Sequence, residues 1–331
     1  MNPHPTTPAA YVMRLLHAVL LILAALASSV VLAQAGPIKI FVGYPPGATS
    51  DTLTRVIAEA MTSRLGQPVV VENKPGAGGQ IANQLVRAAN PDGTTLMMTP
   101  VATMSIFPHS YGARLQYDPF KHFAPVAHLS NFQLGLGVAM SVPATTLADY
   151  VAWVKAQPTT RSLYGSAASG SLPHFFGVLF GKSAGIELQH VPYRGTAASM
   201  QALASGEIAA LSTVAADIGT LVDSGRAKLL AVAGEARSPR FPHIPTFREQ
   251  GFDLVATPWY ALFTTAGTPE AVVSRLAKAA LDAVADPVVR QRMLAMGVEP
   301  TGYPPARLAE IMRADYERWG PPIRDSGFKP D

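Results

Sequence analysis

The fold of this chain is decided by the stretch Gly43-Tyr44-Pro45-Pro46-Gly47-Ala48-Thr49-Ser50-Asp51. The residues before it, Ile38 to Val42, are apolar and β-branched and predict a strand, and Thr52 to Met61 after it predict a helix. Proline and glycine end the strand, while Thr and Ser open the helix, so free backbone N–H groups face out at the positive end of the helix dipole. That arrangement is a ready site for a carboxylate. Asp51, in the first helical turn, is interpreted as a residue that stabilises the dipole rather than a ligand contact.

The first 35 residues have the pattern of an export signal. Arg14 is their only basic residue, Leu15 to Leu32 is almost entirely apolar, and Ala33-Gln34-Ala35 precedes Gly36 as a small-residue cleavage site. A retained membrane anchor is the alternative. Cleavage is favoured because small residues crowd the end of the apolar stretch and no basic cluster follows it. The sequence therefore predicts a periplasmic protein whose signal peptide, residues 1–35, is removed.

The composition excludes several classes of protein. The chain has no cysteine, which excludes disulfides, thiolate nucleophiles, cysteine-ligated zinc and a lipid anchor on cysteine. Charged residues make up only 15%, and the formal charge is +4 with the basic residues scattered. A nucleic-acid partner is therefore not expected, whereas a mild positive balance suits an anionic ligand.

Strand and helix patterns alternate along the chain and predict an α/β fold of mainly parallel sheets flanked by helices. The expected strands are Ile38–Val42, Val69–Glu72, Thr95–Thr99, Leu134–Met140, Leu163–Gly165, Glu187–Val191, Ala227–Val232 and Trp259–Phe263. The expected helices are Thr52–Leu65, Gln80–Ala88, Leu147–Ala156, Pro173–Ala184, Thr196–Ala204, Pro269–Ala285, Pro287–Met296 and Pro304–Trp319.

One large sheet and two separate lobes both fit this alternation. Asn131 to Gly137 and Asp253 to Tyr260 look like extended crossings between otherwise complete α/β units. If they are paired hinges, the first lobe consists of residues 36–135 and 258–331, and the second of residues 136–257. Ligands bind at the carboxyl ends of strands in open α/β sheets, and two lobes would set two such edges face to face.

A second loop, Glu72 to Gly79, again lies between a strand and a helix. It half-matches a dinucleotide fingerprint through Gly76 and Gly78, but Ile81 stands where the third small residue belongs, and no acid follows at the expected distance. No nucleotide cofactor is predicted. The loop either permits close helix–strand packing or lines a cleft.

Two further loops open helices with small hydroxyl residues. Tyr164 to His174 contains Ser166, Ser169 and Ser171, and Val191 to Thr196 contains Tyr193, Arg194 and Gly195. These loops offer N–H and O–H donors, although a turn or a solvated arginine would account for either of them alone. Four such loops, each between a strand and a helix, indicate together more than any one of them does alone.

Catalytic machinery is not recognisable in the chain. It lacks a Gly-x-Ser-x-Gly elbow, a His-Glu-x-x-His helix, a Walker loop and a Ser-x-x-Lys motif, and its histidines show no metal-ligand spacing. His174 is interpreted as structural because no acid–His–Ser arrangement can be read from the spacing. An exported hydrolase or lyase that uses Ser169 and His174 is kept as an alternative; otherwise no enzyme, metal or cofactor is expected.

Taken together, the loops resemble the Bug family of periplasmic solute-binding proteins, the receptors of tripartite tricarboxylate transporters. The resemblance covers essentially the whole mature chain. It is carried by Tyr44-Pro45-Pro46-Gly47 with Asp51 and Arg55, Leu65 to Asn73, Pro75 to Gly79, Pro91-Asp92-Gly93, Tyr117-Asp118-Pro119, Phe123-Ala124-Pro125, Gly165 to His174, Val191 to Gly195, Ile244-Pro245-Thr246 and Gly267-Thr268-Pro269.

The resemblance implies a two-lobed protein, of the type II-like periplasmic-binding-protein fold, that closes on a small carboxylate and holds it by backbone and hydroxyl donors from both lobes. Ala48 replaces a glycine usual in the family, and Ala198, Ala202 and Ala209 replace a proline and two acids. This favours plain carboxylates over amino acids. The positions that match the family's ligand loops are Tyr44, Pro46, Gly47, Ala48, Thr49, Ser50, Gly76, Gly78, Gly79, Ser166, Ala167, Ser169, Ser171, Tyr193, Gly195, Thr196 and Asp217.

The expected function is therefore that of a monomeric receptor that delivers a small organic acid or amino acid to membrane transporter subunits. A ligand-loaded partner of a membrane sensor would use the same cleft and stays open as an alternative. Tyr44, Phe132, Trp259 and Tyr260 would make the cleft suitable for aromatic ligands, yet each also fits a core position. Dicarboxylates, tricarboxylates, aromatic acids, nicotinate-like acids and amino acids all remain candidate ligands.

Overall fold

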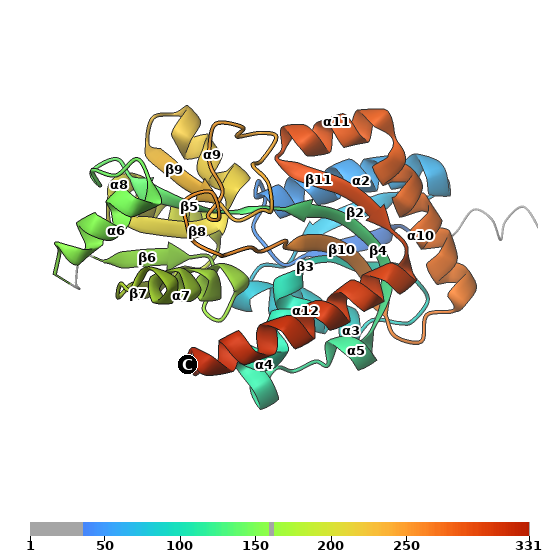
Figure 1. Cartoon of the computed structure of the whole chain (residues 1–331). Coiled ribbons are helices and arrows are strands. Elements are labelled where there is room, and N and C mark those ends of the chain that lie inside the picture. The colour runs from blue at the N-terminus through green and yellow to red at the C-terminus, as the bar shows by residue number, and fades with distance from the viewer. Residues whose placement is uncertain (1–35, 159–161, 331) are drawn as a thin grey trace, which may run out of the picture. The chain divides into compact units, whose positions relative to one another are not determined.

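Two β-sheets organise the described part of the chain, residues 36–158 and 162–330, in this computed structural model (Figure 1). The elements from Ile38 onward belong to one compact unit. The strands of the first sheet are β1 (Ile38–Val42), β2 (Val69–Asn73), β3 (Thr95–Pro100), β4 (Phe123–Phe132), β10 (Trp259–Thr265) and β11 (Val298–Tyr303). They lie in the order β11-β4-β10-β3-β1-β2. The predicted signal peptide, residues 1–35, lies outside the described residues.

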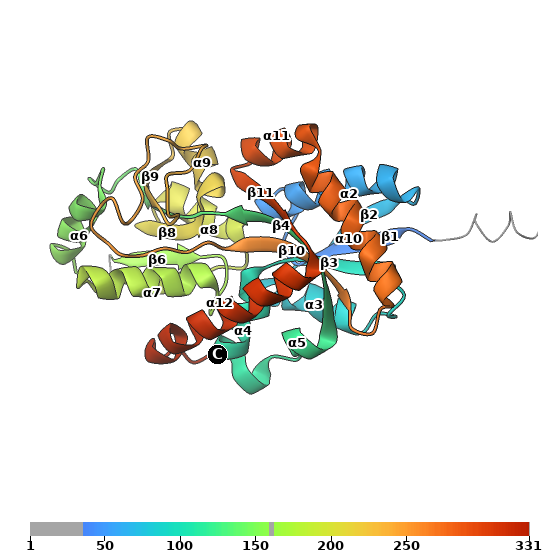
Figure 2. The same ribbon diagram turned by 45° about the vertical axis from the view of Figure 1, so that its right-hand side comes forward.

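Helices cover both faces of the first sheet and bury its apolar side chains (Figures 1 and 2). On one face lie α2 (Thr49–Leu65), α10 (Glu270–Ala285) and α11 (Pro287–Ala295), and on the other lie α3 (Gln80–Arg87), α4 (Phe107–Tyr111), α5 (Pro119–His122) and α12 (Pro305–Asp325). Short 3₁₀ or π-helical turns span Ala77–Gly79, Ala102–Ile106 and Gly112–Arg114. Helix α2 ends where Gly66 adopts a left-handed conformation with φ +63°. Among the described residues, no helix is both long enough and apolar enough to cross a bilayer.

The second sheet is built from the middle of the chain. Its strands are β5 (Leu134–Ala139), β6 (Leu163–Ser166), β7 (Gln189–Pro192), β8 (Ala210–Val214) and β9 (Ala227–Val232), in the order β7-β6-β8-β5-β9. Its helices are α6 (Leu147–Lys155), α7 (Leu172–Ala184), α8 (Thr196–Ser205) and α9 (Ala215–Asp223). Helices α8 and α9 pack together, and α7 lies on the opposite face of the sheet (Figure 1).

The chain passes between the sheets at two places. Strand β4 of the first sheet leads into β5 of the second through the single residue Gln133, and the segment 233–258 returns from β9 to β10. Both extended segments singled out in the sequence lie at these points. Beyond helix α12, Phe328 packs edge-on against His174 and Phe175 of α7, so the C-terminal tail also touches the second sheet's helices.

The expected α/β class is confirmed, but the sheets are mixed rather than mainly parallel. In the first sheet β1 pairs in parallel with β2 and β3, whereas β10 pairs antiparallel with β3 and β4, and β11 antiparallel with β4. In the second sheet β5 pairs antiparallel with both β8 and β9. Strands β5 and β10, which receive the chain from the other sheet, run antiparallel to both of their neighbours, because neither follows a helical crossover on its own sheet.

Several elements were missed by the sequence patterns. Strands β4, β8 and β11 and helix α9 were not expected. Strand β4 contains Pro125, and β11 contains Pro300 and Gly302, all residues that break a strand pattern. Helix α9 follows β8 directly, with no turn signal at the junction of Val214 and Ala215.

Candidate functional site

The first predicted loop, Tyr44 to Ser50, is held in shape by the carboxylate of Asp51. Asp51 Oδ2 accepts a hydrogen bond from the backbone N–H of Gly47 at 3.0 Å, and Asp51 Oδ1 accepts one from Asn73 Nδ2 at 2.9 Å. The Arg55 guanidinium lies 2.9 Å from the same carboxylate. Burial acts to raise the pKa of Asp51, but the hydrogen bonds from Arg55, Gly47 and Asn73 outweigh it and lower that pKa. Asp51 therefore fixes the conformation of the loop, and its carboxylate oxygens are already hydrogen-bonded within the protein.

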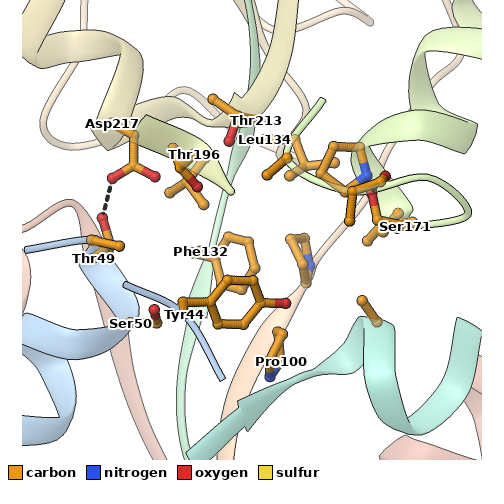
Figure 3. Close-up of a pocket in the computed structure, with 18 of the residues that line it drawn as sticks. Tyr44, Thr49, Ser50, Pro100, Phe132, Leu134, Ser171, Thr196, Thr213 and Asp217 are labelled. Carbon is orange, nitrogen blue, oxygen red and sulfur yellow. Dashed lines mark hydrogen bonds between the residues drawn. The ribbon is translucent and has the colours of Figure 1, made fainter. Parts of the chain in front are cut away.

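Helix N-termini from both sheets meet at a cavity of about 70 Å³ (Figure 3). Thr49 is the first residue of α2, Ser171 precedes α7 and Thr196 is the first residue of α8, and all three line this cavity. The first N–H groups of a helix have no partner inside the helix and carry partial positive charge. No lysine, arginine or histidine is among the residues that line the cavity. Helix ends and hydroxyl groups are thus the donors available to a negatively charged ligand here.

Asp217, near the start of α9, closes one end of this cavity. Its Oδ1 accepts a hydrogen bond of 2.6 Å from Thr49 Oγ1, which joins the second sheet's helix to the first sheet's helix (Figure 3). Burial raises the pKa of Asp217 to about 6, although hydrogen bonds from the side chain and backbone of Thr49 act to lower it. The cavity therefore contains one carboxyl group and no basic side chain.

An aromatic pair forms part of the cavity wall. Phe132, the last residue of β4, stacks on Tyr260 of β10 with ring centroids 4.3 Å apart and planes 22° from parallel. Both side chains are at least 95% buried, and both lie beside the points where the chain changes sheets. The remaining apolar lining residues are Ala48, Pro100, Val101, Ala102, Leu134, Ala167, Ala168, Leu172, Pro173, Val214 and Pro258. The lining of the cavity thus combines hydroxyl groups and one carboxyl group with a larger set of apolar side chains.

Two open grooves adjoin the cavity, with volumes of about 370 and 540 Å³. Tyr44 lines both the cavity and the larger groove, and its hydroxyl donates to Gly78 O at 3.1 Å. Predicted residues at the cavity are Tyr44, Ala48, Thr49, Ser50, Ala167, Ser171, Thr196 and Asp217. Those at the smaller groove are Pro46, Gly47, Ala48, Thr196 and Asp217, and those at the larger are Tyr44, Gly76, Gly78, Ala167, Ser169, Tyr193 and Gly195.

Two predicted residues, Gly79 and Ser166, line none of these spaces. Ser166 is fully buried, and its Oγ lies 2.8 Å from His190 Nε2 and donates to Ala168 O at 3.0 Å. Gly79 packs against the backbone of Gly43, where an added Cβ would come within 2.5 Å of the Gly79 Cα. The Ser166 hydroxyl is already hydrogen-bonded, and Gly79 is packed against Gly43. Both residues therefore hold the shape of their loops rather than contact a ligand.

The contacts of His174 are those of a structural residue rather than of a catalytic base. His174 Nδ1 accepts the backbone N–H of Gly170 at 3.0 Å, and its ring stacks on that of His190 with centroids 3.8 Å apart. The backbone carbonyl of Ser169 accepts a hydrogen bond from Tyr111 Oη at 2.9 Å. No hydrogen bond joins the side chains of Ser169 and His174 in the described structure, so the pair lacks the contact between nucleophile and base that a hydrolase needs. Among the described residues, no group of three or more His, Asp or Glu is placed to bind a metal.

These buried histidines should make the protein sensitive to acid. Burial lowers the pKa of His174 to about 4, and burial together with the neighbouring His174 lowers that of His190 to about 3. An unfolded histidine titrates near 6.5, so between pH 6.5 and 4 the unfolded chain binds more protons than the folded one. Stability is therefore full above pH 6.5 and falls as the pH drops, by about 2–3 kcal/mol for each such histidine by pH 4. Urea unfolding at pH 7, 5.5 and 4.5 measures this loss.

The pH dependence of stability in His190→Gln and in His243→Gln shows whether the stacked histidines cause this loss. His190→Gln should flatten the fall in stability, whereas His243 is exposed and its replacement should leave the fall unchanged. The raised pKa of Asp217 acts in the opposite direction over part of this range, which is why the difference between variants is the quantity to measure. Equal slopes in the two variants would show that the stacked histidines do not cause the acid sensitivity.

Several cavity residues were missed from the sequence. Thr213 and Val214 end the unexpected strand β8, and Pro258 precedes β10. The useful signal was positional, because the carboxyl ends of sheet strands are where α/β proteins bind ligands. Of the aromatic candidates, Tyr44, Phe132 and Tyr260 line the cavity. Trp259 does not; it is buried, and its Nε1 donates to Asp315 Oδ2 of α12 at 2.7 Å.

The chain matches the tripartite tricarboxylate transporter family receptor over residues 53–328. It is 34% identical over 264 residues to the UPF0065 protein in the gbd 5′ region of Cupriavidus necator, a match that covers 80% of this chain and 79% of that protein.

Solved structures agree with this assignment. Rpa4515 of R. palustris, solved with adipate, is 27% identical, with a TM-score of 0.86 over 90% of this chain and 99% of that one. MatC of Rhodopseudomonas palustris, solved with bound malate, is 29% identical, with a TM-score of 0.81 over 87% of this chain and 99% of that one. These relatives are substrate-binding receptors rather than enzymes. The chain belongs to the tripartite tricarboxylate transporter receptor family, to which the Bug proteins also belong.

Proposed function

We propose that this protein is a periplasmic receptor that captures a small organic carboxylate between two lobes and delivers it to the membrane subunits of a tripartite tricarboxylate transporter. The lobes are residues 36–135 with 258–331, and residues 136–257, except that β5 begins at Leu134, so Leu134 and Gly135 belong to the second sheet. The observation that carries the proposal is the meeting of the N-termini of α2, α7 and α8, from both sheets, at one cavity without a basic side chain. Such helix ends favour anions.

Closure about the ligand is the functional motion. A cavity of about 70 Å³ has room for roughly two water molecules and is far smaller than the few hundred Å³ of an ordinary ligand pocket. Separation of the lobes would widen this space for an organic acid, and closure would bring the helix ends of both lobes onto it. Bending at the two crossings between the sheets would allow this, because a hinge needs only a few residues that change φ and ψ.

The ligand class proposed is an organic acid with an apolar body. A carboxylate at the helix ends would meet the hydroxyls of Thr49 and Thr196, while the carbon chain would lie against Phe132 and Tyr260. Adipate, with which one relative was solved, is an acid of this kind, whereas the malate bound to another relative is a shorter hydroxy acid that shares only the carboxylates. We propose that the cavity and groove residues predicted from the sequence contact the ligand, while Gly79 and Ser166 hold the loops in shape. We also propose that the receptor acts as a monomer.

The first experiment is a thermal-shift screen of residues 36–331 against organic acids and amino acids. The panel includes adipate, malate, citrate, nicotinate and aspartate. A ligand at 100 times its Kd should raise the stability by about 2.7 kcal/mol, or the melting temperature by about 5 °C. A shift with one class of acids supports the receptor function. If no acid shifts a protein shown by mass spectrometry to carry no retained ligand, the proposed function fails.

A matched pair of variants on helix α2 tests the site itself. Thr49→Val removes a hydroxyl from the cavity, and Thr52→Val makes the same change at an exposed position one turn along. The loss of a hydrogen bond to a charged group should weaken ligand binding about ten-fold in Thr49→Val by titration calorimetry. Thr52→Val should bind like the wild type. Equal affinities in the two variants would rule out this end of the cavity as the carboxylate site.

A further inference from the structure

The carboxyl group of Asp217 occupies the place where a ligand's carboxylate is expected. It lies at the N-terminus of α2, where Thr49 offers it both a side-chain hydrogen bond of 2.6 Å and a backbone hydrogen bond. These are the donors that an incoming anion would use under the proposed function, on which this inference rests. Asp217 also borders both the cavity and the smaller groove, so a ligand in either space lies beside it.

No cation compensates this carboxyl group. Among the residues that line the cavity and the smaller groove, the titratable ones besides Asp217 are Tyr44 and Tyr260, and none is basic. Helix α2 also carries Asp51, but that carboxylate is paired with Arg55. Helix α8 contributes Thr196, Ala197, Met200 and Gln201 to the groove, and helix α9 adds Thr220 and Leu221, all without charge.

Two carboxylates at one helix end disfavour each other's ionised form. When like charges share a site with little solvent, the pKa of one of them rises strongly. Asp217 already binds its proton more readily than a solvated aspartate, because burial raises its pKa to about 6 before any ligand is present. A ligand carboxylate beside it would raise that pKa further, whereas separation of the lobes would restore an ordinary aspartate.

We propose that a plain carboxylate enters this cleft together with one proton, which Asp217 holds. The proton comes from the solvent and binds the Asp217 carboxylate, and no covalent bond between protein and ligand forms or breaks. Neutral Asp217 then offers an O–H donor to the ligand in place of a repelling charge. Capture of the acid is thus coupled to proton uptake, and the cleft selects acids without an ammonium group.

The coupling has a measurable signature in wild-type protein. Calorimetry at pH 7 in buffers of different ionisation enthalpy gives the number of protons taken up per ligand bound. The probe is adipate or, if another acid of the panel gives a larger thermal shift, that acid. We expect the uptake to approach one proton. The affinity should fall about ten-fold per pH unit above pH 6, as long as Asp217 is ionised in the free protein and protonated in the complex, and should level off once the complex also loses the proton.

Two variants of α9 complete the test. Asp217→Asn should abolish the uptake and make the affinity independent of pH between 6 and 8. Asp223→Asn removes an exposed carboxylate at the other end of α9 and should keep the uptake of the wild type. Binding without proton uptake in wild-type protein overturns the inference, as does unchanged uptake in Asp217→Asn. Tight binding of aspartate that Asp217→Asn destroys would also overturn it, because the carboxylate would then pair with an ammonium group.

The failure of this inference is distinguishable from the failure of the proposed function. If an acid binds with no proton taken up, the protein is a receptor and Asp217 has another role. If no acid of the panel binds at any pH between 5 and 8, the receptor function itself is wrong.

Discussion

Replacement of Phe132 by alanine should lower the free energy of unfolding by about 3–5 kcal/mol and change the size of acid that the protein prefers. The ring is 95% buried and stacks on Tyr260, so its loss removes both apolar burial and an aromatic contact. It also enlarges the cavity, because Phe132 lines it. We expect weaker binding of short acids and stronger relative binding of bulkier ones, measured by urea unfolding and by the thermal-shift panel.

Phe123→Ala is the matched control at the other end of strand β4. Phe123 is 96% buried and packs edge-on against Tyr117, but it does not line the cavity. This variant should lose a similar amount of stability and keep the ligand preference of the wild type. If both variants alter the preference alike, the effect comes from general loosening of the first sheet, and Phe132 does not set the size of the site.

Replacement of Gly43 by valine should cost about 3 kcal/mol of stability and weaken ligand binding at least ten-fold. A Cβ at this position would lie 2.5 Å from the Cα and 2.9 Å from the carbonyl oxygen of Gly79. Both contacts are with backbone, so no side chain can turn aside and one of the two loops must move. Because Gly43 precedes the loop that starts α2, the movement would displace Thr49 from the cavity. Urea unfolding and calorimetry with the best panel ligand measure the two effects.

Gly225→Ala separates this clash from the general cost of replacing a glycine. Gly225 has φ +68° and no atom within 4 Å of an added Cβ. Alanine there should cost only about 1 kcal/mol, from the strain of the left-handed backbone, and should not affect the ligand. Wild-type affinity in Gly43→Val would mean that the contact between the two loops is not needed to form the site.

The sequence predicted those parts of the fold that have local signals. The strand–turn–helix unit from Ile38 to Leu65 was recognisable because β-branched residues, Pro-Gly turn chemistry and helix-opening hydroxyl residues follow one another in order. Strand β11 was missed because Pro300 and Gly302 interrupt its strand pattern. The strand forms by pairing with β4, which is far away in the chain. Mixed sheets were also not foreseen, since strand direction depends on pairings such as β10 with β3 that local patterns do not encode.

The sequence likewise predicted only part of the candidate site. Loops that open helices were found, because glycine and hydroxyl residues before a helix are visible in the sequence. The apolar wall formed by Pro100, Leu134 and Pro258 was not, because it takes shape only when the ends of three strands from different parts of the chain meet. The inward burial of Ser166 was equally hidden, since its partner His190 comes from the neighbouring strand β7.

Strand β10 lies at the centre of the first sheet, between β3 and β4, although it is made late in the chain. Until it is present, β4 cannot be joined to β3, β1 and β2, whereas the second sheet has all its strands by Val232. The second sheet can therefore be completed early, and β1, β2 and β3 can pair with one another, but β4 and the open edge of β3 must wait for the last third. Waiting strands leave unpaired edges, which other chains or chaperones can bind. The interleaved order of strands thus leaves β4 and one edge of β3 unpaired until the chain is nearly complete.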